Sequence, residues 1–184
     1  MGRIAVMKPL THALGVIAML AAAYQVHSAT VSGDLHGLMK NVVAPQTQVI
    51  WDVGNRAQDD QGNPDASKLA AEDWSKLIDA AGKVRQVAQT LAQSEHILVA
   101  APGVKIDGEG TADARSAKQV QAAMDANPKE FQALSQALAT SMDQVVAAAR
   151  AKDAAKVFDV SGALDQVCEN CHVKFWYPEQ KAAQ

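Results

Sequence analysis

The chain has 184 residues, of which 48% are hydrophobic and 20% are charged, and its formal net charge is −3. A chain of this size and composition is long enough to bury the core of one globular domain. The slight excess of acidic residues argues against nucleic acid and against an anionic membrane surface as partners, because both of these polyanions attract basic proteins.

The N-terminal residues have the pattern of a secretory signal peptide. Arg3 and Lys8 form a basic start, residues 13–23 form a short apolar segment, and Val26-His27-Ser28 fits a cleavage site. The apolar run is shorter than the ~20 residues that a membrane-spanning helix needs. Removal of the segment is therefore favoured over a single membrane anchor.

We accordingly divide the chain into two parts. Residues 1–28 are predicted to be a cleaved signal peptide, and residues 29–184 are predicted to form one helical domain exported to the periplasm. Loss of Arg3 and Lys8 leaves 15 basic against 20 acidic residues, a formal charge of −5.

Apolar residues recur at helical spacing in four segments of the mature part, and strand patterns are nearly absent. The first predicted helix spans residues 34–53, with Asp34 or Ser32 as its cap. Pro45 removes one backbone donor inside this helix, so a kink or a restart is expected there. Gly54-Asn55 is expected to end it.

The second predicted helix spans residues 67–93, and a long connection, residues 94–111, follows it. Connections of this length in compact domains are usually functional or disordered. Two possibilities stay open at this point: the connection covers an edge of a bound group, or it hangs off the domain.

The third predicted helix extends over residues 112–151 and pauses at Asn127-Pro128, which has the features of a helix N-terminus. The fourth predicted helix covers residues 153–177, and Pro178 helps to end it. Each of these helices has one apolar face.

The most specific signal in the chain is Cys168-Glu169-Asn170-Cys171-His172, within the fourth predicted helix. Cys-x-x-Cys-His is the attachment signature of c-type haem. The two thiols form thioethers with one porphyrin, and the adjacent histidine binds the iron as proximal ligand. Because Cys168 and His172 are four positions apart, they project from the same side of a helix. We predict one covalently attached haem c.

Other interpretations of two closely spaced cysteines are weaker. A structural zinc site needs further ligands at similar spacing, and the chain has only these two cysteines. A thioredoxin-like motif opens a helix after a strand, whereas this motif lies near the end of a helical chain. A disulfide across two intervening residues would be strained.

A helix that presents thioethers and an iron ligand on its apolar face needs partner helices that close over the porphyrin. Four amphipathic helices with mostly short connections predict an all-α fold, an antiparallel four-helix bundle with covalently attached haem near the C-terminus.

In these features the chain resembles the class II c-type cytochromes, the cytochrome c-prime family. The features are an exported precursor, four helices, the motif at 168–172 on the last helix, and an aromatic residue at Phe175. The resemblance implies that the haem lies between the first and last helices. It also implies a methionine as the distal ligand in low-spin members, and Met39 occupies the matching position.

Alternatives for the distal position stay open. Met39 could fill the core, as most methionines on a helix stripe do. His36, one turn earlier, could bind the iron instead, or the iron could stay five-coordinate, as in cytochrome c-prime proper. Met124 and Met142 lie on the third predicted helix, which is expected to be farther from the iron.

The aromatic residues after the motif are expected to divide their roles. Phe175, three positions after His172, is predicted to pack beside the porphyrin. Trp176 and Tyr177 are expected to point elsewhere, as amphipathic residues at the end of the bundle. His96, in the long connection, is expected to be a surface histidine.

The resemblance implies a periplasmic monohaem cytochrome that carries single electrons and is not an enzyme. Its expected partners are periplasmic redox proteins and the cytochrome c maturation machinery, with a homodimer possible and no nucleic acid. One alternative is a five-coordinate protein that binds nitric oxide or carbon monoxide. Another is a haem subunit docked to an exported dehydrogenase.

Overall fold

The computed structural model describes residues 1–2 and 33–178, and in this part of the chain the regular structure is helical. Apart from the first two residues, the predicted signal peptide and its cleavage bond lie outside the described residues. No described helix combines the length and the apolar character needed to cross a membrane.

The helical elements follow one another along the chain with two short non-α turns among them. In order they are α1 (Leu35–Leu38), the π-helical turn η1 (Met39–Val43), α2 (Ala44–Arg56), the 3-10 turn η2 (Ala66–Lys68), α3 (Ala71–Gln93), α4 (Ala117–Ala126), α5 (Pro128–Ala151) and α6 (Ala154–Phe175).

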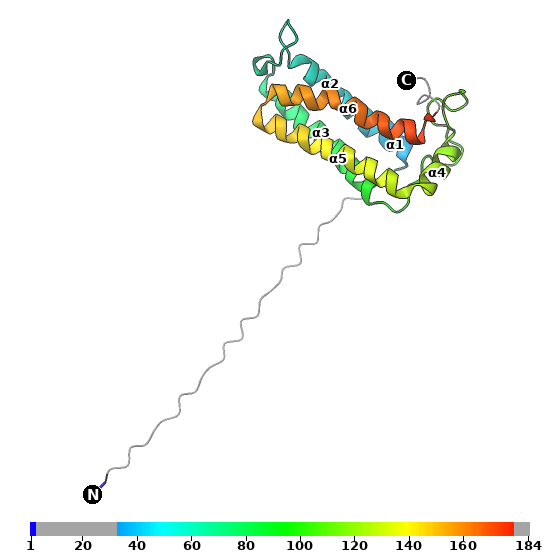
Figure 1. Cartoon of the computed structure of the whole chain (residues 1–184), viewed down its shortest axis with the longest axis horizontal. Coiled ribbons are helices and arrows are strands. Elements are labelled where there is room, and N and C mark those ends of the chain that lie inside the picture. Colours follow the sequence, from blue (N-terminus) through cyan, green and yellow to red (C-terminus); the bar gives the residue numbers. More distant parts are fainter. Residues whose placement is uncertain (3–32, 179–184) are drawn as a thin grey trace.

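The long helices confirm the predicted antiparallel four-helix bundle (Figure 1). α3 packs against α2 and α5, and α6 packs against α5 and α2, so each long helix lies between two others. The core between them includes Ile50, Leu77, Leu91, Met142 and Leu164, all fully buried. The predicted pause at Asn127-Pro128 is a complete break, and α4 crosses the end of the bundle where α6 finishes (Figure 1).

α1, η1 and α2 form one continuous rod that widens at η1. The N–H of Ala44 donates to the carbonyl oxygen of Met39, five positions earlier. Pro45 has no N–H for the carbonyl four positions before it, and its ring would clash with that carbonyl in a regular α-helix. A π-turn directly before Pro45 relieves this conflict. The expected interruption therefore takes the form of a wider turn that begins at Met39.

Gly54 does not end the first helix, contrary to the prediction from the sequence. α2 continues to Arg56, and Gly54 is buried within it. A Cβ added at Gly54 would overlap the hydroxyl of Ser161 and lie 2.9 Å from its Cβ. Beside this contact, the indole N–H of Trp51 donates to the carbonyl oxygen of Ser161 at 3.1 Å. Glycine is needed here because α2 and α6 approach closely.

The Gly54→Ala substitution is expected to lower the free energy of unfolding by about 1–3 kcal/mol, because the new methyl group overpacks the crossing of α2 and α6. Urea denaturation of the variant measures this. Gly82→Ala on α3 is the matched control, since a Cβ there meets nothing within 4 Å. The control is expected to gain about 0.5–1 kcal/mol from helix propensity. Equal effects at the two positions would contradict the close approach.

Candidate functional site

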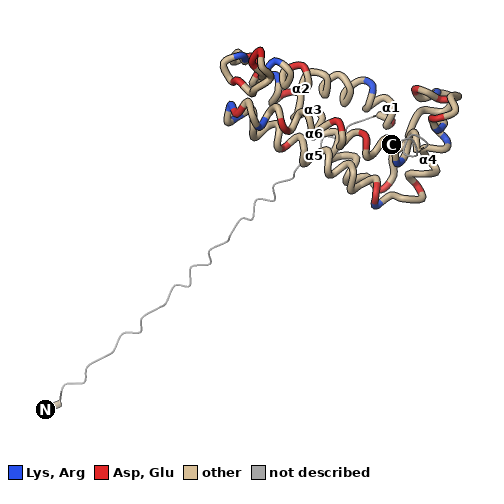
Figure 2. The backbone as a smooth tube through the Cα atoms, turned by 45° about the horizontal axis from the view of Figure 1, so that its top comes forward, with Lys and Arg blue, Asp and Glu red and all other residues tan. Residues whose placement is uncertain are grey.

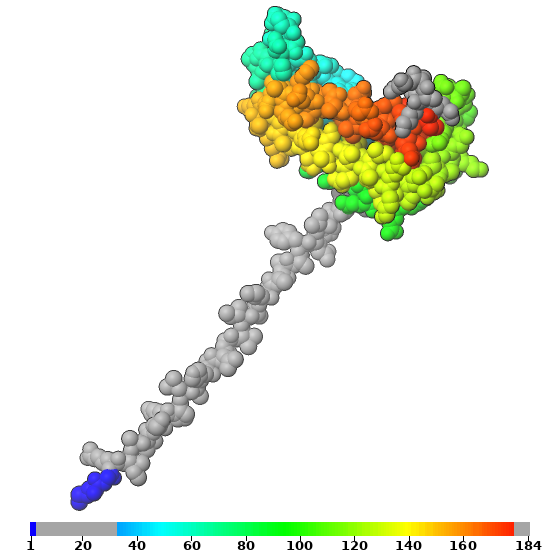
Figure 3. Space-filling view, viewed as in Figure 1, coloured from blue at the N-terminus to red at the C-terminus, as the bar shows by residue number. Residues whose placement is uncertain are grey.

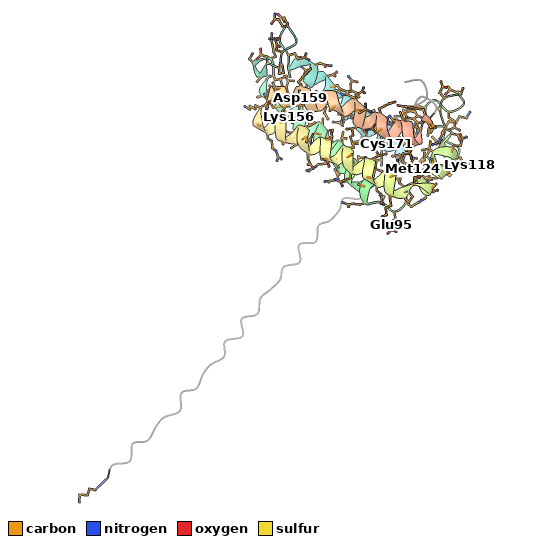
Figure 4. The ribbon with its side chains drawn as sticks, in the orientation of Figure 1. Glu95, Lys118, Met124, Lys156, Asp159 and Cys171 are labelled. Atoms are coloured by element: carbon orange, nitrogen blue, oxygen red, sulfur yellow. The ribbon has the colours of Figure 1, made fainter. Side chains whose placement is uncertain are left out.

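The Cys-x-x-Cys-His motif continues the buried stripe of α6 toward the end of that helix. Val157 and Leu164, earlier on the stripe, are fully buried, whereas Cys168, Cys171 and His172 are half-buried. The two cysteines form no disulfide with each other. Figure 4 shows Cys171 at the end of the bundle where α4 lies. The sequence prediction that the motif shares the apolar face of the last helix is confirmed.

The first rod and α6 separate as they approach the motif. α6 packs closely against α2, but α1 and η1 are not among its main packing partners. Both views of the backbone place α1 near the C-terminal end of α6 (Figures 1 and 2). Closely packed helices have axes about 8–10 Å apart, and a flat macrocycle between two helices needs more room. α1 and η1 therefore pack less closely against α6 than α2 does.

Burial favours the neutral forms of all three motif side chains. It raises the pKa of Cys168 to about 11, with a further contribution from the carboxylates of Asp165 and Glu169. It raises the pKa of Cys171 to about 12. It lowers the pKa of His172, although Glu169 acts in the opposite direction. A neutral imidazole is the form that binds a metal, so the donor set fits covalent haem with one histidine ligand.

Trp176 and Tyr177 pack on His172, and the prediction that they point elsewhere is wrong. The Trp176 ring meets the imidazole edge-on, with centroids 5.2 Å apart and planes at 88°. The Tyr177 ring lies 5.7 Å from it, centroid to centroid. The backbone N–H groups of both residues donate to the carbonyl oxygen of His172, at 2.7 and 3.0 Å. The chain therefore folds back over the histidine while satisfying an end carbonyl of α6.

Phe175 is buried, and its ring meets Phe131 of α5 edge-on with centroids 5.7 Å apart. Its place beside the porphyrin stays a prediction. Met142 lies in the core of the bundle, and Met124 is buried on α4. His96 is exposed, as the sequence predicted.

Met39 and His36 lie on the end of the rod that is level with the motif. Met39 is half-buried, packs against the core and begins the π-turn. The Nε2 atom of His36 is buried without a hydrogen-bond partner, and the nearest carboxylate oxygen, of Asp107, is 3.8 Å away. A buried polar atom without a partner is costly. A bound group that forms a hydrogen bond with Nε2 of His36 would remove this cost.

The long connection packs onto both sides of this region and does not hang off the domain. Val99 and Ile106 are buried. The N–H groups of Leu35 and His36 donate to the carbonyl oxygens of Leu98 and Val99, both at 2.8 Å. The space-filling view shows the connection against the C-terminal end of α6 (Figure 3). The connection therefore links the start of the first rod to the end of the last helix.

Arg115 joins this connection to α6. Its guanidinium donates to the carbonyl oxygens of Lys174 and Phe175, at 3.1 and 3.2 Å. Its backbone N–H donates to the carbonyl oxygen of Trp176 at 2.9 Å. The last carbonyls of a helix have no partner within the helix. Sequence reasoning missed Arg115 because its contacts span about 60 residues and follow no local pattern.

The Arg115→Ala substitution is expected to lower the free energy of unfolding by about 1–3 kcal/mol, because it removes two hydrogen bonds from a charged donor, one of them part-buried. Hydrogen exchange is also expected to become faster in residues 94–116. Thermal unfolding and exchange mass spectrometry measure the two effects. Arg150→Ala, at an exposed position on α5, is the control and is expected to change neither. If hydrogen exchange in residues 94–116 is no faster in Arg115→Ala than in the wild type, Arg115 does not hold this connection on α6.

Comparison with known families identifies the same region. The sequence model of the family described as Cytochrome C' matches residues 73–176, which are 104 of the 184 residues. The match includes the motif on α6, whereas Met39 and His36 lie before it. No curated protein and no solved structure matches the chain. Haem c, predicted from the motif, is the cofactor that the family implies.

Proposed function

This chain belongs to the cytochrome c-prime family of c-type cytochromes, and we propose that it carries single electrons in the periplasm with an iron bound by His172 and Met39. The observation that carries this proposal is the position of Met39. It is a half-buried thioether at the first residue of a π-turn, on the rod end level with the motif.

Three residues of α6 hold the cofactor in this proposal. Cys168 and Cys171 form the two thioethers, and His172 is the proximal ligand. Their common face, their partial burial and the neutral state of the imidazole support these roles. The haem, once bound, supplies an iron that alternates between the ferric and ferrous states.

Met39 acts as the distal ligand from the opposite side. π-turns occur frequently at functional sites, because the wider turn redirects a side chain. Packing against the core holds Met39 in place, so its position does not depend on the charge of the iron. A histidine–methionine pair also raises the reduction potential relative to two histidines. A fixed ligand and a stable coordination number suit electron transfer.

A second function has support from the family itself. Cytochrome c-prime proper has five-coordinate iron, and Met39 lies outside the residues that the family model matches. In that case Met39 fills the core and the distal side binds nitric oxide or carbon monoxide. The buried, unpartnered Nε2 of His36 supports a further variant in which this histidine approaches the bound group.

The visible spectrum with and without carbon monoxide distinguishes these possibilities. The mature protein is expected to be low-spin and to change little when the gas is added. Met39→Leu removes the sulfur while keeping the volume, so it is expected to become high-spin and to bind the gas. Met124→Leu makes the same change at a buried position on α4 and is expected to leave the spectrum unchanged.

Two results would refute the electron-carrier proposal. One is a wild-type spectrum that is high-spin and shifts sharply with carbon monoxide, which supports gas binding. The other is a low-spin Met39→Leu variant, which removes Met39 from the iron. If His36→Ala then gives the high-spin product, the distal ligand is His36.

We further propose that residues 1–28 are removed on export and that the partners are periplasmic redox proteins and the cytochrome c maturation machinery. Acidic and basic residues are interspersed along the bundle (Figure 2), whereas nucleic-acid-binding domains cluster basic residues on one face. An electron carrier needs no catalytic group, so we propose no enzymatic activity. A homodimer would be consistent with the family.

The intact mass of the secreted protein tests the export proposal. It is expected to equal residues 29–184, or a form shorter by one residue, plus one haem. The control is a chain that starts at residue 29 and lacks the signal; it is expected to remain without haem, because attachment occurs outside the cytoplasm. A mature protein that still begins at Met1 would contradict the cleavage.

A further inference from the structure

We propose that Tyr177 and Glu169 are positioning residues for His172 and that their hydrogen bonds hold the imidazole as an electron-rich ligand. The inference rests on the proposed role of His172 as the proximal ligand, and it deepens that role. It concerns side chains that sequence reasoning did not connect with the iron.

The three side chains form a chain of hydrogen bonds. The hydroxyl of Tyr177 donates to Oε2 of Glu169 at 3.0 Å. The hydroxyl oxygen of Tyr177 also lies 3.3 Å from Nδ1 of His172. A phenol has a single hydrogen to donate, and in this arrangement it goes to Glu169. Tyr177 is therefore the acceptor toward His172, and Nδ1 carries the proton.

This arrangement selects one tautomer of the imidazole. With the proton on Nδ1, the lone pair is on Nε2, which is then the nitrogen free to bind iron. Histidine ligands commonly donate their other N–H to a partner that fixes both the tautomer and the ring orientation. In this chain a tyrosine takes that place.

The backbone and the neighbouring ring hold Tyr177 in position. Its N–H donates to the carbonyl oxygen of His172 at 3.0 Å. Trp176 packs edge-on against the imidazole, and its indole N–H donates to the carbonyl oxygen of Asp107 at 3.0 Å. The hydroxyl of Tyr177 is thus directed by the turn that ends α6.

Glu169 gives the chain of hydrogen bonds its electronic effect. It occupies one of the two variable positions between the cysteines, so the attachment motif itself supplies the final acceptor. A carboxylate that accepts from Tyr177 makes the tyrosine oxygen a better acceptor for Nδ1–H, because linked hydrogen bonds polarise one another. The imidazole becomes a stronger electron donor. A stronger donor stabilises ferric over ferrous iron and lowers the reduction potential.

Asp165 offers a matched test of charge without this hydrogen bond. It lies on α6 one turn before Glu169, and its charge also acts on Tyr177. Its replacement by asparagine removes one negative charge, as does replacement of Glu169 by glutamine. Only Glu169→Gln alters the acceptor of the Tyr177 hydroxyl.

The experiment measures reduction potentials of the mature haem protein and of its variants. Tyr177→Phe is expected to shift the potential to a more positive value. Glu169→Gln is expected to shift it in the same direction and by more than Asp165→Asn. In the Tyr177→Phe background, most of the Glu169→Gln shift is expected to disappear, while the Asp165→Asn shift persists. Such a double-mutant cycle isolates the coupling between the two residues.

Two results would overturn the proposal. One is a Tyr177→Phe potential equal to that of the wild type. The other is a Glu169→Gln shift of the same size in both backgrounds, which would be an effect of charge alone. If Tyr177→Phe does not fold, equal shifts for Glu169→Gln and Asp165→Asn in the wild-type background also refute it.

The spectra of the same variants separate this inference from the proposed function. A five-coordinate iron in the wild type would refute Met39 as ligand and leave the comparison of potentials valid, because the hydrogen bonds act on the proximal side. An unchanged spectrum in His172→Ala would instead refute His172 as ligand, and the inference would fail with it.

Discussion

One face of α6 has to serve two purposes along a single helix. Its first half packs into the bundle through fully buried residues such as Val157 and Leu164. Its last turns carry the thiols and the imidazole, which are only half-buried. The contact of Gly54 with Ser161 brings the first rod against the first half of α6. Beyond this contact, α1 and η1 pack less closely against α6 than α2 does.

The remaining features hold the start of the rod and the end of α6 in place. A π-turn before Pro45 puts Met39 at the widened part of the rod. The connection between α3 and α4 is bonded to the start of that rod and, through Arg115, to the last carbonyls of α6. Trp176 and Tyr177 then close over His172. In the proposed electron carrier, this packing would keep His172 and Met39 in position when the charge of the iron changes.

Periodicity and one motif were enough to predict the helical segments, the bundle and the cofactor. They were not enough for features that depend on distant partners. Gly54 looks like a helix stop, and only Ser161, on another helix, explains it. Arg115 follows no local pattern. Trp176 and Tyr177 were misjudged because an amphipathic side chain at a helix end suits solvent equally well, and the reversal of the chain toward His172 is a backbone effect. A pattern identifies a face of a helix but does not name the residue that this face meets.

We propose that Cys168 and Cys171 together anchor one haem on the last turns of α6. Protease digestion of the mature protein, followed by alkylation and tandem mass spectrometry, tests it directly. We expect the peptide containing both residues to carry the mass of one haem and to resist alkylation at either sulfur. A peptide in which both thiols are alkylated, with the haem extracted by acidified solvent, would contradict it.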